Sequence, residues 1–230
     1  GQLRLAQFMF REPAALVVHT GDIAYLEGTF EQFRNNHFAI YSPLMRRVPF
    51  FPSPGNHEYD SPNALPYVML HANPTDGVPA ADHQRYYSFD WGDVHFTAVD
   101  VNTPFQEALA GRGEMIRWLD NDLRRSQRLW RVVYFHHPVR PTSNHERDPT
   151  SALVRQHLEP IFDRHHVQLI LSGHEHNYQQ AAPRLGGSFV EPGQGGTINI
   201  ITGGGGAPLY SVSPREGLVF ADSKYHYVRA

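Results

Sequence analysis

Residues 169 to 178 read LILSGHEHNY, where an apolar run ends and two histidines follow one residue apart. The run from Val167 to Leu171 has the length and composition of a buried strand. Side chains two residues apart on a regular strand point to the same side. We therefore expect His174 and His176 to project together, which suits one shared metal ion or two neighbouring ions. A polar turn that happens to contain histidines is the alternative interpretation.

Three other segments repeat this pattern of an apolar strand followed at once by residues that can bind metals. They are VVHTGDIAY at 17–25, FFPSPGNHE at 50–58 and VVYFHHP at 132–138. In α/β sheets, loops from separate strands converge beyond the carboxyl ends of the strands. Four such loops indicate one metal site assembled from distant parts of the chain, to which His174 and His176 would contribute last.

Helical and strand patterns alternate along most of the chain, and the last part is β and glycine-rich. Helices are expected over 2–12, 29–40, 113–126 and 150–166, strands over 14–18, 48–51, 131–135 and 167–171, and a hairpin over 85–100 that turns at Gly92-Asp93. This order predicts an α/β protein with a mixed sheet, or two sheets, between helical layers. No repeat or low-complexity linker divides the sequence, so we expect a single domain over 1–230.

The composition narrows the chemistry. The chain has 230 residues, of which 40% are hydrophobic, with a formal net charge of -3. No apolar run approaches the roughly 18–20 residues of a membrane span, and no basic face is indicated for a nucleic-acid partner. Cysteine is absent while histidine occurs 15 times, so a transition-metal site must use imidazole, carboxylate, amide or phenolate ligands. HExxH and GxSxG motifs are absent, which excludes zincins and α/β-hydrolases.

The motifs GDIAY, GNHE, VVYFH and GHEHNY, in this order, resemble those of the calcineurin-like metallophosphoesterases. The tyrosine in GDIAY and the GHxHxY form of the last motif resemble the purple acid phosphatases in particular. The resemblance extends from residue 20 to about residue 210. It implies that family's αββα sandwich, in which two mixed β-sheets are flanked by helices.

The resemblance also implies a centre of two metal ions, with Fe(III) at the first position and Zn(II), Mn(II) or Fe(II) at the second. The implied ligands are Asp22 as the bridge, Tyr25 and His176 on the first ion, and Asn56, His136 and His174 on the second. His57 resembles the family's proton donor to the leaving group. His145, nine residues after His136, resembles a histidine that faces the substrate.

The chemistry of these residue types agrees with that assignment. A carboxylate can bridge two cations about 3.5–4 Å apart, and two cations lower the pKa of a shared water so that hydroxide can attack a phosphate. Tyrosinate is a hard anionic ligand that favours a trivalent ion. The expected function is therefore a dinuclear-metal phosphoesterase, acid-phosphatase-like on small phosphomonoesters, using a metal-bridged hydroxide. A phosphodiesterase of the same fold and a non-catalytic metal-binding relative are the alternatives.

Three departures from the family pattern matter. The family's first motif, Asp-x-Gly, is absent, and a helical pattern begins at Gly1, so we expect the chain to be truncated and the first strand to lie upstream. Gln179-Gln180 stands where purple acid phosphatases usually have Glu-Arg. VVYFHHP offers two histidines, of which we choose His136 because the family's ligand lies two residues before proline.

An alternative role for Tyr25 is to pack its ring under the loop without binding a metal. The resemblance favours a periplasmic or secreted location.

Overall fold

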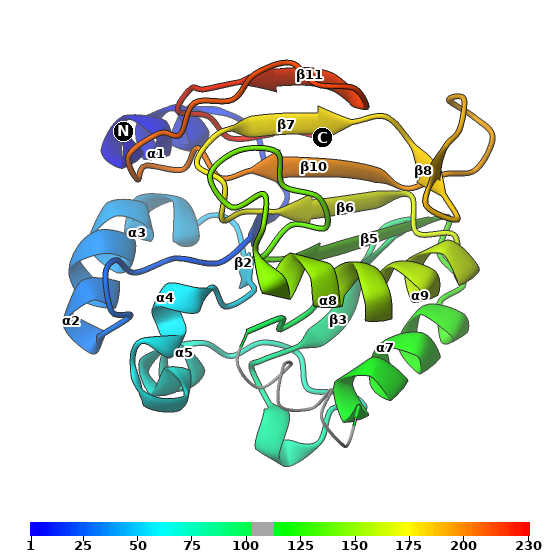
Figure 1. Cartoon of the computed structure of the whole chain (residues 1–230). Coiled ribbons are helices and arrows are strands. Elements are labelled where there is room, and N and C mark those ends of the chain that lie inside the picture. The colour runs from blue at the N-terminus through cyan, green and yellow to red at the C-terminus, as the bar shows by residue number, and fades with distance from the viewer. Residues whose placement is uncertain (103–112) are drawn as a thin grey trace.

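A seven-stranded mixed sheet forms the main layer of the computed structural model, which describes residues 1–102 and 113–230 (Figure 1). Its strands, in spatial order, are β11 (Leu218–Asp222), β7 (Tyr178–Ala181), β10 (Ile198–Thr202), β6 (Leu169–Ser172), β5 (Trp130–Phe135), β4 (Val94–Ala98) and β3 (Tyr87–Trp91). The four central strands β10, β6, β5 and β4 are parallel, whereas β3 and β7 run antiparallel to their neighbours. The carboxyl ends of β5 and β6 therefore meet at one edge.

A second sheet consists of β1 (Val17–His19) and β2 (Phe50–Pro52), which pair in parallel with Val18 opposite Phe51. Val18 and Phe51 pack against one face of the large sheet, where they contact a cluster that includes Tyr87 and Tyr134. The end of β1 lies beside the ends of β5 and β6. The backbone N–H of Gly173, after β6, donates to the carbonyl of His136, after β5. The ring of His136 in turn bonds to the carbonyl of Thr20, after β1. A small separate hairpin joins β8 (Arg184–Leu185) and β9 (Ser188–Phe189).

Helices cover both outer faces. Figure 1 shows α7 (Glu114–Arg125), α8 (Pro149–His157) and α9 (Glu159–Arg164) on the face of the large sheet opposite β1 and β2. Their fully buried Leu119, Val154 and Phe162 join one core with Val133 and Ile170 of the sheet. On the other side, α1 (Gln2–Arg11) and α3 (Ala39–Met45) cover β1 and β2. The predicted helix–sheet–sheet–helix fold class is confirmed, and the second sheet has two parallel strands among the described residues.

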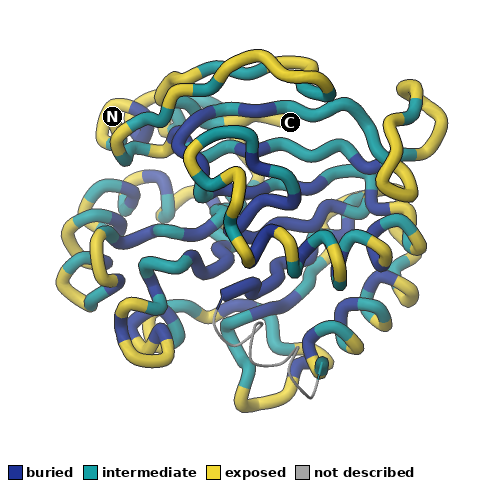
Figure 2. The backbone as a smooth tube through the Cα atoms, viewed as in Figure 1, coloured by how far each residue is buried: buried dark blue, intermediate teal, exposed yellow. Residues whose placement is uncertain are grey.

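Shorter helices fill the connections on the side of β1 and β2. They are α2 (Phe30–Phe33), a π-helical segment η1 (Arg34–Phe38), α4 (Asn56–Tyr59) and α5 (Leu65–Leu70), with a 3-10 turn at Pro62–Ala64. A second 3-10 turn, Ala80–Asp82, lies between Val78 and Tyr86, which pack in the core beside α7. In Figure 2 the buried residues lie along the strands of the large sheet and the exposed ones on outer helices and loops. None of the helices in 1–102 or 113–230 is both long and apolar enough to cross a membrane.

Two helix predictions differ from the structure. The helix predicted over 29–40 extends to Met45, beyond Pro43, and contains the π-helical segment Arg34–Phe38, in which the backbone N–H of Ala39 bonds to the carbonyl of Arg34. The helix predicted over 150–166 divides at Leu158, because the Pro160 ring disfavours continuation of α8. The hairpin with its turn at Gly92-Asp93 is confirmed by the pairing of Trp91 with Val94.

Candidate metal centre

The loops after β1, β2, β5 and β6 meet at one place, and the residues predicted from sequence lie there. Oδ2 of Asp22 is 3.0 Å from the Tyr25 hydroxyl and 3.1 Å from Nε2 of His136. The Tyr25 hydroxyl is in turn 3.1 Å from Nε2 of His176. Nε2 of His136 is 3.1 Å from Nδ1 of His174. One carboxylate oxygen thus lies between a Tyr25–His176 pair and a His136–His174 pair.

Asn56 begins α4 beside this carboxylate, and its Oδ1 is buried without a hydrogen-bond partner. The next backbone N–H, that of His57, donates to Oδ1 of Asp22 over 3.1 Å. Gly55 makes this approach possible, since a Cβ there would lie 2.2 Å from Oδ1 of Asp22. The buried, unpartnered amide oxygen is what a cation ligand requires.

The geometry of His174 and His176 differs from the expectation of a regular strand. Strand β6 ends at Ser172, and His174 has a φ of +66°, in the left-handed region that a strand does not use. The two side chains consequently contact different partners, His136 for His174 and Tyr25 for His176. The prediction that they project together from a strand is wrong, although both reach the same centre.

Backbone carbonyls fix the orientation of two of the histidine rings. Nδ1–H of His136 donates to the carbonyl of Thr20, and Nδ1–H of His176 donates to the carbonyl of Pro208, each over 2.8 Å. A neutral imidazole that carries its proton on Nδ1 has its lone pair on Nε2. In both residues Nε2 is the nitrogen that faces Asp22 or Tyr25, and it is the nitrogen that would bind a cation at the centre.

Charge and burial oppose one another here. Burial alone would raise the pKa of Asp22, but the His136 ring, its hydrogen bond and, to a smaller extent, His57 hold that pKa below its usual range. Burial also lowers the pKa of His136, and the Asp22 charge reverses this and raises it. Burial, followed by the Asp22 charge, raises the pKa of Tyr25 well above its usual range. Burial and the neighbouring carboxylate thus favour the protonated phenol at Tyr25.

His57 lies at the open side of the centre. Its Nδ1 is 2.5 Å from the carbonyl of Leu26, and its ring packs against Tyr25 at a centroid distance of 4.5 Å. Nε2 is 3.9 Å from Oδ2 of Asp22, and the side chain is 26% exposed. Because Nδ1–H is bonded to Leu26, Nε2 is the nitrogen free to exchange a proton with a bound molecule.

His145 lies over the other half of the centre. Its ring is 3.9 Å from the ring of His174 and 5.5 Å from that of Tyr210. The buried Glu175 holds this loop, because its carboxylate accepts the backbone N–H groups of Asn144 and His145 and the Ser143 hydroxyl. The structure therefore places both predicted catalytic histidines around the predicted metal ligands.

Three residues of the site, Glu58, Tyr210 and Asp148, were not predicted from the sequence. Glu58 is fully buried and accepts backbone N–H groups of Asp22, Ile23, Ala24 and Gly55, which ties the first two motif loops together. Burial and the Asp22 charge raise the pKa of Glu58 to about 7. Tyr210 stacks on His176 at 4.2 Å, and Asp148 lies 3.3 Å from His174. The glutamate follows His57 in GNHE and was visible there; the other two lie outside any motif.

The donor set fits metal ions. Donor atoms of Asp22, His136 and His174 lie within 4.8 Å of one another, close enough for a single ion. Tyr25 and His176 supply an oxygen and a nitrogen on the other side of the Asp22 carboxylate. Imidazole, carboxylate and amide donors suit Zn(II), Mn(II) and Fe.

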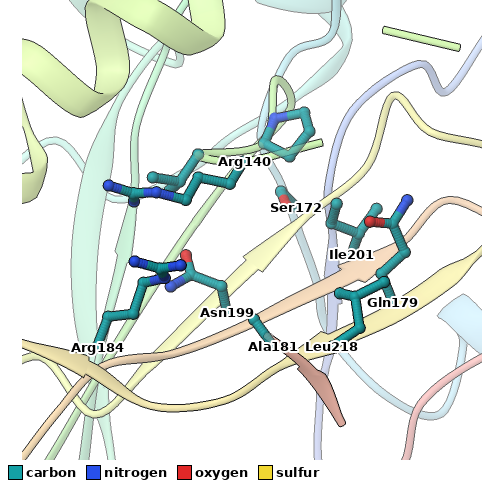
Figure 3. Close-up of a pocket in the computed structure, with 10 residues that line it drawn as sticks. Arg140, Ser172, Gln179, Ala181, Arg184, Asn199, Ile201 and Leu218 are labelled. Atoms are coloured by element: carbon teal, nitrogen blue, oxygen red, sulfur yellow. The ribbon is translucent and has the colours of Figure 1, made fainter. Parts of the chain in front are cut away.

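A small pocket lies beside this centre, against the face of strands β6, β7, β10 and β11 (Figure 3). Arg140, Arg184 and Asn199 line it together with Ser172, Gln179 and the side chains of Pro138, Val139, Ala181, Ile201 and Leu218. The predicted site residues are not among the described residues that line it. Polar atoms of Asp22, Tyr25, His136 and His174 contact one another at 3.0–3.1 Å instead.

The sequence and fold of the chain are similar to those of known proteins. A family model described as calcineurin-like phosphoesterase matches residues 2–178. A probable inactive purple acid phosphatase 9 of Arabidopsis thaliana is 28% identical over 235 residues, which cover 87% of this chain and 35% of that protein. Acid phosphatase type 7 of Homo sapiens is 28% identical over 244 residues, which cover 93% of this chain and 54% of that protein. The chain thus spans about a third to a half of the length of these two relatives.

The fold has a close match among solved structures. The purple acid phosphatase PPD1 from yellow lupin superposes with a TM-score of 0.80 and 19% identity, over 97% of this chain and 43% of that chain. This likeness supports the fold, and the match of the family model to most of the chain supports the family. The chain belongs to the calcineurin-like phosphoesterase family, and its relatives include purple acid phosphatases.

Proposed function

We propose that this chain is a two-metal phosphoesterase that hydrolyses small phosphomonoesters. The observation that supports this most directly is the place of Asp22, whose Oδ2 lies 3.0 Å from the Tyr25 hydroxyl and 3.1 Å from Nε2 of His136. A carboxylate between two groups of donors is suited to bridge two ions. Tyr25 and His176 would hold the first ion, and Asn56, His136 and His174 the second.

The chain's own residues have distinct tasks in this proposal. When bound, two ions lower the pKa of a water and neutralise charge on the phosphate. Asp22 fixes their separation, and the carbonyls of Thr20 and Pro208 orient two ligand rings. A His57 ring that carries protons on both nitrogens would give its Nε2 proton to the leaving oxygen, which would otherwise depart as an alkoxide, and would keep the Nδ1–H bond to the carbonyl of Leu26. His145, held by Glu175, faces the phosphate from the side of His174.

The metals we propose are Fe(III) at the first position and Zn(II), Mn(II) or Fe(II) at the second. Tyr25 supports the trivalent ion, because burial and Asp22 keep the phenol protonated unless a strong Lewis acid binds. The partner we propose is a small phosphate ester. Neither a nucleic-acid nor a membrane partner is part of this proposal.

The names of some relatives include the word inactive, so a metal-binding protein without catalysis is the second candidate. The donors that the chain brings together around Asp22 and the partly exposed His57 ring beside them favour catalysis. A phosphodiesterase would share every residue discussed so far, since the two reactions differ in the groups around the phosphate.

The test combines metal analysis with a substrate panel. The full chain is stripped of metal, reloaded with iron plus zinc or manganese, and assayed on phosphomonoesters and phosphodiesters. Asp22→Asn, which keeps the shape and removes the charge, is the matched variant. We expect two equivalents of metal and monoester hydrolysis in the wild type, and loss of both metals and of activity in Asp22→Asn.

Two results would contradict the proposal. Two bound ions without turnover of any phosphoester would favour the non-catalytic candidate. Faster turnover of diesters than of monoesters would favour a phosphodiesterase.

A further inference from the structure

Asp148 places a buried carboxylate behind the centre, at a position that the two-metal proposal does not use. It is the N-cap of α8, where its Oδ1 accepts the backbone N–H of Thr150 over 2.8 Å. Its other oxygen, Oδ2, is buried and has no well-aligned hydrogen-bond partner. That oxygen lies 3.3 Å from Nε2 of His174 and 3.8 Å from Nε2 of His137, and the three side chains are 8–12% exposed.

A buried carboxylate oxygen without a donor is unfavourable, so a proton or a cation must face it. The ring of His174 can supply the proton. Its Nδ1 lies 3.1 Å from Nε2 of His136, within the metal-binding residues, and its Nε2 faces Asp148. A neutral imidazole has one N–H, and only the tautomer with that N–H on Nε2 satisfies Asp148 and leaves the Nδ1 lone pair toward the centre.

The other two ligand histidines follow the same arrangement. His136 and His176 each point one nitrogen into the centre and the other at a backbone carbonyl, of Thr20 and Pro208 respectively. His174 has Asp148 in the corresponding place, so this acceptor is a full negative charge. A carboxylate behind a ligand histidine orients the ring and makes it a stronger donor to a metal.

We propose that Asp148 is a positioning residue, which accepts the Nε2–H of His174 and thereby keeps Nδ1 unprotonated for the second metal ion. The role toward the metal rests on the proposed function, while the tautomer does not. Helix α8 gives the carboxylate its direction, because the cap to Thr150 uses Oδ1 and leaves Oδ2 for the histidine.

A third metal ion is the competing interpretation, since donor atoms of His137, Asp148 and His174 also lie within 4.8 Å of one another. That ion would need Nε2 of His174 as a lone pair. If Nδ1 of the same ring holds the second ion, the ring would have to lose both protons and become an imidazolate. The proton therefore suits this position better than a cation.

The helix cap makes a sharp pair of variants available. Asp148→Asn can still cap α8 through its amide oxygen, which directs the NH₂ group at Nε2 of His174. An N–H donor there stabilises the opposite tautomer, with the proton on Nδ1. The serine in Asp148→Ser also caps helices well, but its side chain is too short to reach the ring of His174. This variant therefore removes the acceptor for Nε2–H and puts no donor in its place. Asp163→Asn is the control, because Asp163 likewise accepts one backbone N–H, that of Gly186, away from the centre.

The first measurement is the tautomer of His174 in the metal-free protein, read from the nitrogen chemical shifts of its ring and assigned with a His174→Gln spectrum. We expect the proton on Nε2 in the wild type and in Asp163→Asn, and on Nδ1 in Asp148→Asn. The second measurement is the Kd and stoichiometry of Zn(II). We expect Asp148→Asn to weaken the second ion by roughly 10–100-fold with unchanged stoichiometry at saturation, and Asp148→Ser to weaken it less.

An Nε2-protonated His174 in Asp148→Asn would overturn the inference. So would the loss of one whole equivalent of metal with the remaining affinities unchanged, because Asp148 would then be a ligand of a third ion. If the wild type bound a single ion, the proposed function would fail, yet the tautomer would still decide the role of Asp148.

Discussion

Tyr25 shows how the surroundings of one residue restrict its chemistry. Its hydroxyl contacts Asp22 and His176, and burial together with the Asp22 charge raises its pKa. If Fe(III) binds at the first position, the phenolate should give a purple colour through charge transfer. We expect Tyr25→Phe to keep the ring packed against His57 and to lose that colour.

The measurement is the visible absorption spectrum of iron-loaded wild type and variant at equal iron content. An unchanged spectrum in Tyr25→Phe, or a colourless iron-loaded wild type, would identify Tyr25 as a packing residue instead.

His57 allows proton donation to be separated from metal binding. Its Nε2 lies 3.9 Å from Oδ2 of Asp22, outside hydrogen-bond range, so removal of the ring should leave the metal ligands intact. We expect His57→Ala to retain metal and to reduce turnover by roughly 10²–10⁴-fold for alkyl phosphates. The loss should be much smaller for p-nitrophenyl phosphate, whose leaving group needs no proton. The same loss for every leaving group would exclude proton donation by His57.

The sequence was informative about these residues because each directly follows a strand. Asp22, Asn56, His136 and His174 lie in the short segments that follow four apolar strands, which end at His19, Pro52, Phe135 and Ser172. Asp148 could not be found this way, since it lies in the loop before α8 and approaches His174 through the tertiary fold. Tyr210 follows a glycine-rich segment, and no local pattern places its ring on His176.

At the scale of elements, the central strands were predicted to within one to three residues because they are apolar on both sides. The elements that were not predicted depend on hydrogen bonds that local sequence patterns do not show. Helix α4, inside a predicted loop, has only four residues, and it is fastened by Glu58, whose carboxylate accepts the Gly55 N–H at its start. Strand β7 has the polar sequence YQQA, which resembles a strand only once it pairs with β10 and β11.

The π-helical segment η1 carries a buried histidine that should make the fold sensitive to acid. His37 is 2% exposed among aromatic rings that include Phe38 and Phe50, and its Nδ1 has no hydrogen-bond partner. Burial, followed by the neighbouring His19 and His71, lowers the pKa of His37 from 6.5 to about 3. Below pH 6.5 the unfolded chain therefore takes up a proton that the folded chain does not.

Stability should accordingly fall as the pH falls from 6.5 toward 3. For His37 alone we expect a loss of roughly 2–3 kcal/mol between neutrality and about pH 4.5. His37→Phe keeps a flat ring and removes the titration, so the difference in unfolding free energy between these two pH values should shrink by that amount. His166→Asn, at an exposed position, is the control that removes a histidine without this effect. The measurement is urea unfolding of the metal-free protein at both pH values, and an equal decrease in wild type and His37→Phe would contradict the argument.

At the scale of the whole molecule, the alternation of helices and strands along the sequence predicted the layers of the fold. It did not predict which strands pair with one another in the large sheet. The sequence places β3 to β6 in order but gives no sign that β10 joins β6 in parallel and β7 enters between β10 and β11. Such pairing is decided by contacts between distant segments and not by local periodicity. The four motif loops nevertheless meet, because β1 pairs in parallel with β2 and β5 with β6.

This topology supplies the two proposed ions unequally. Among the described residues, the second position has Asp22, Asn56, His136 and His174, whereas the first has Asp22, Tyr25 and His176. Burial and the Asp22 charge also raise the pKa of Tyr25, which favours the protonated phenol over the phenolate that a metal ion would bind. We therefore expect Zn(II) to fill the second position before the first when the metal-free chain is titrated.

Two matched variants decide which step belongs to which position. His174→Ala should weaken the tighter of the two binding steps, and His176→Ala should weaken only the looser one, because the two rings contact different halves of the centre. Both steps are read by calorimetry with Zn(II), and Asp22→Asn should abolish both because its carboxylate lies between the halves. If His176→Ala affects the tighter step instead, the order is reversed, and the position with Tyr25 and His176 binds Zn(II) more tightly than the position with His136 and His174.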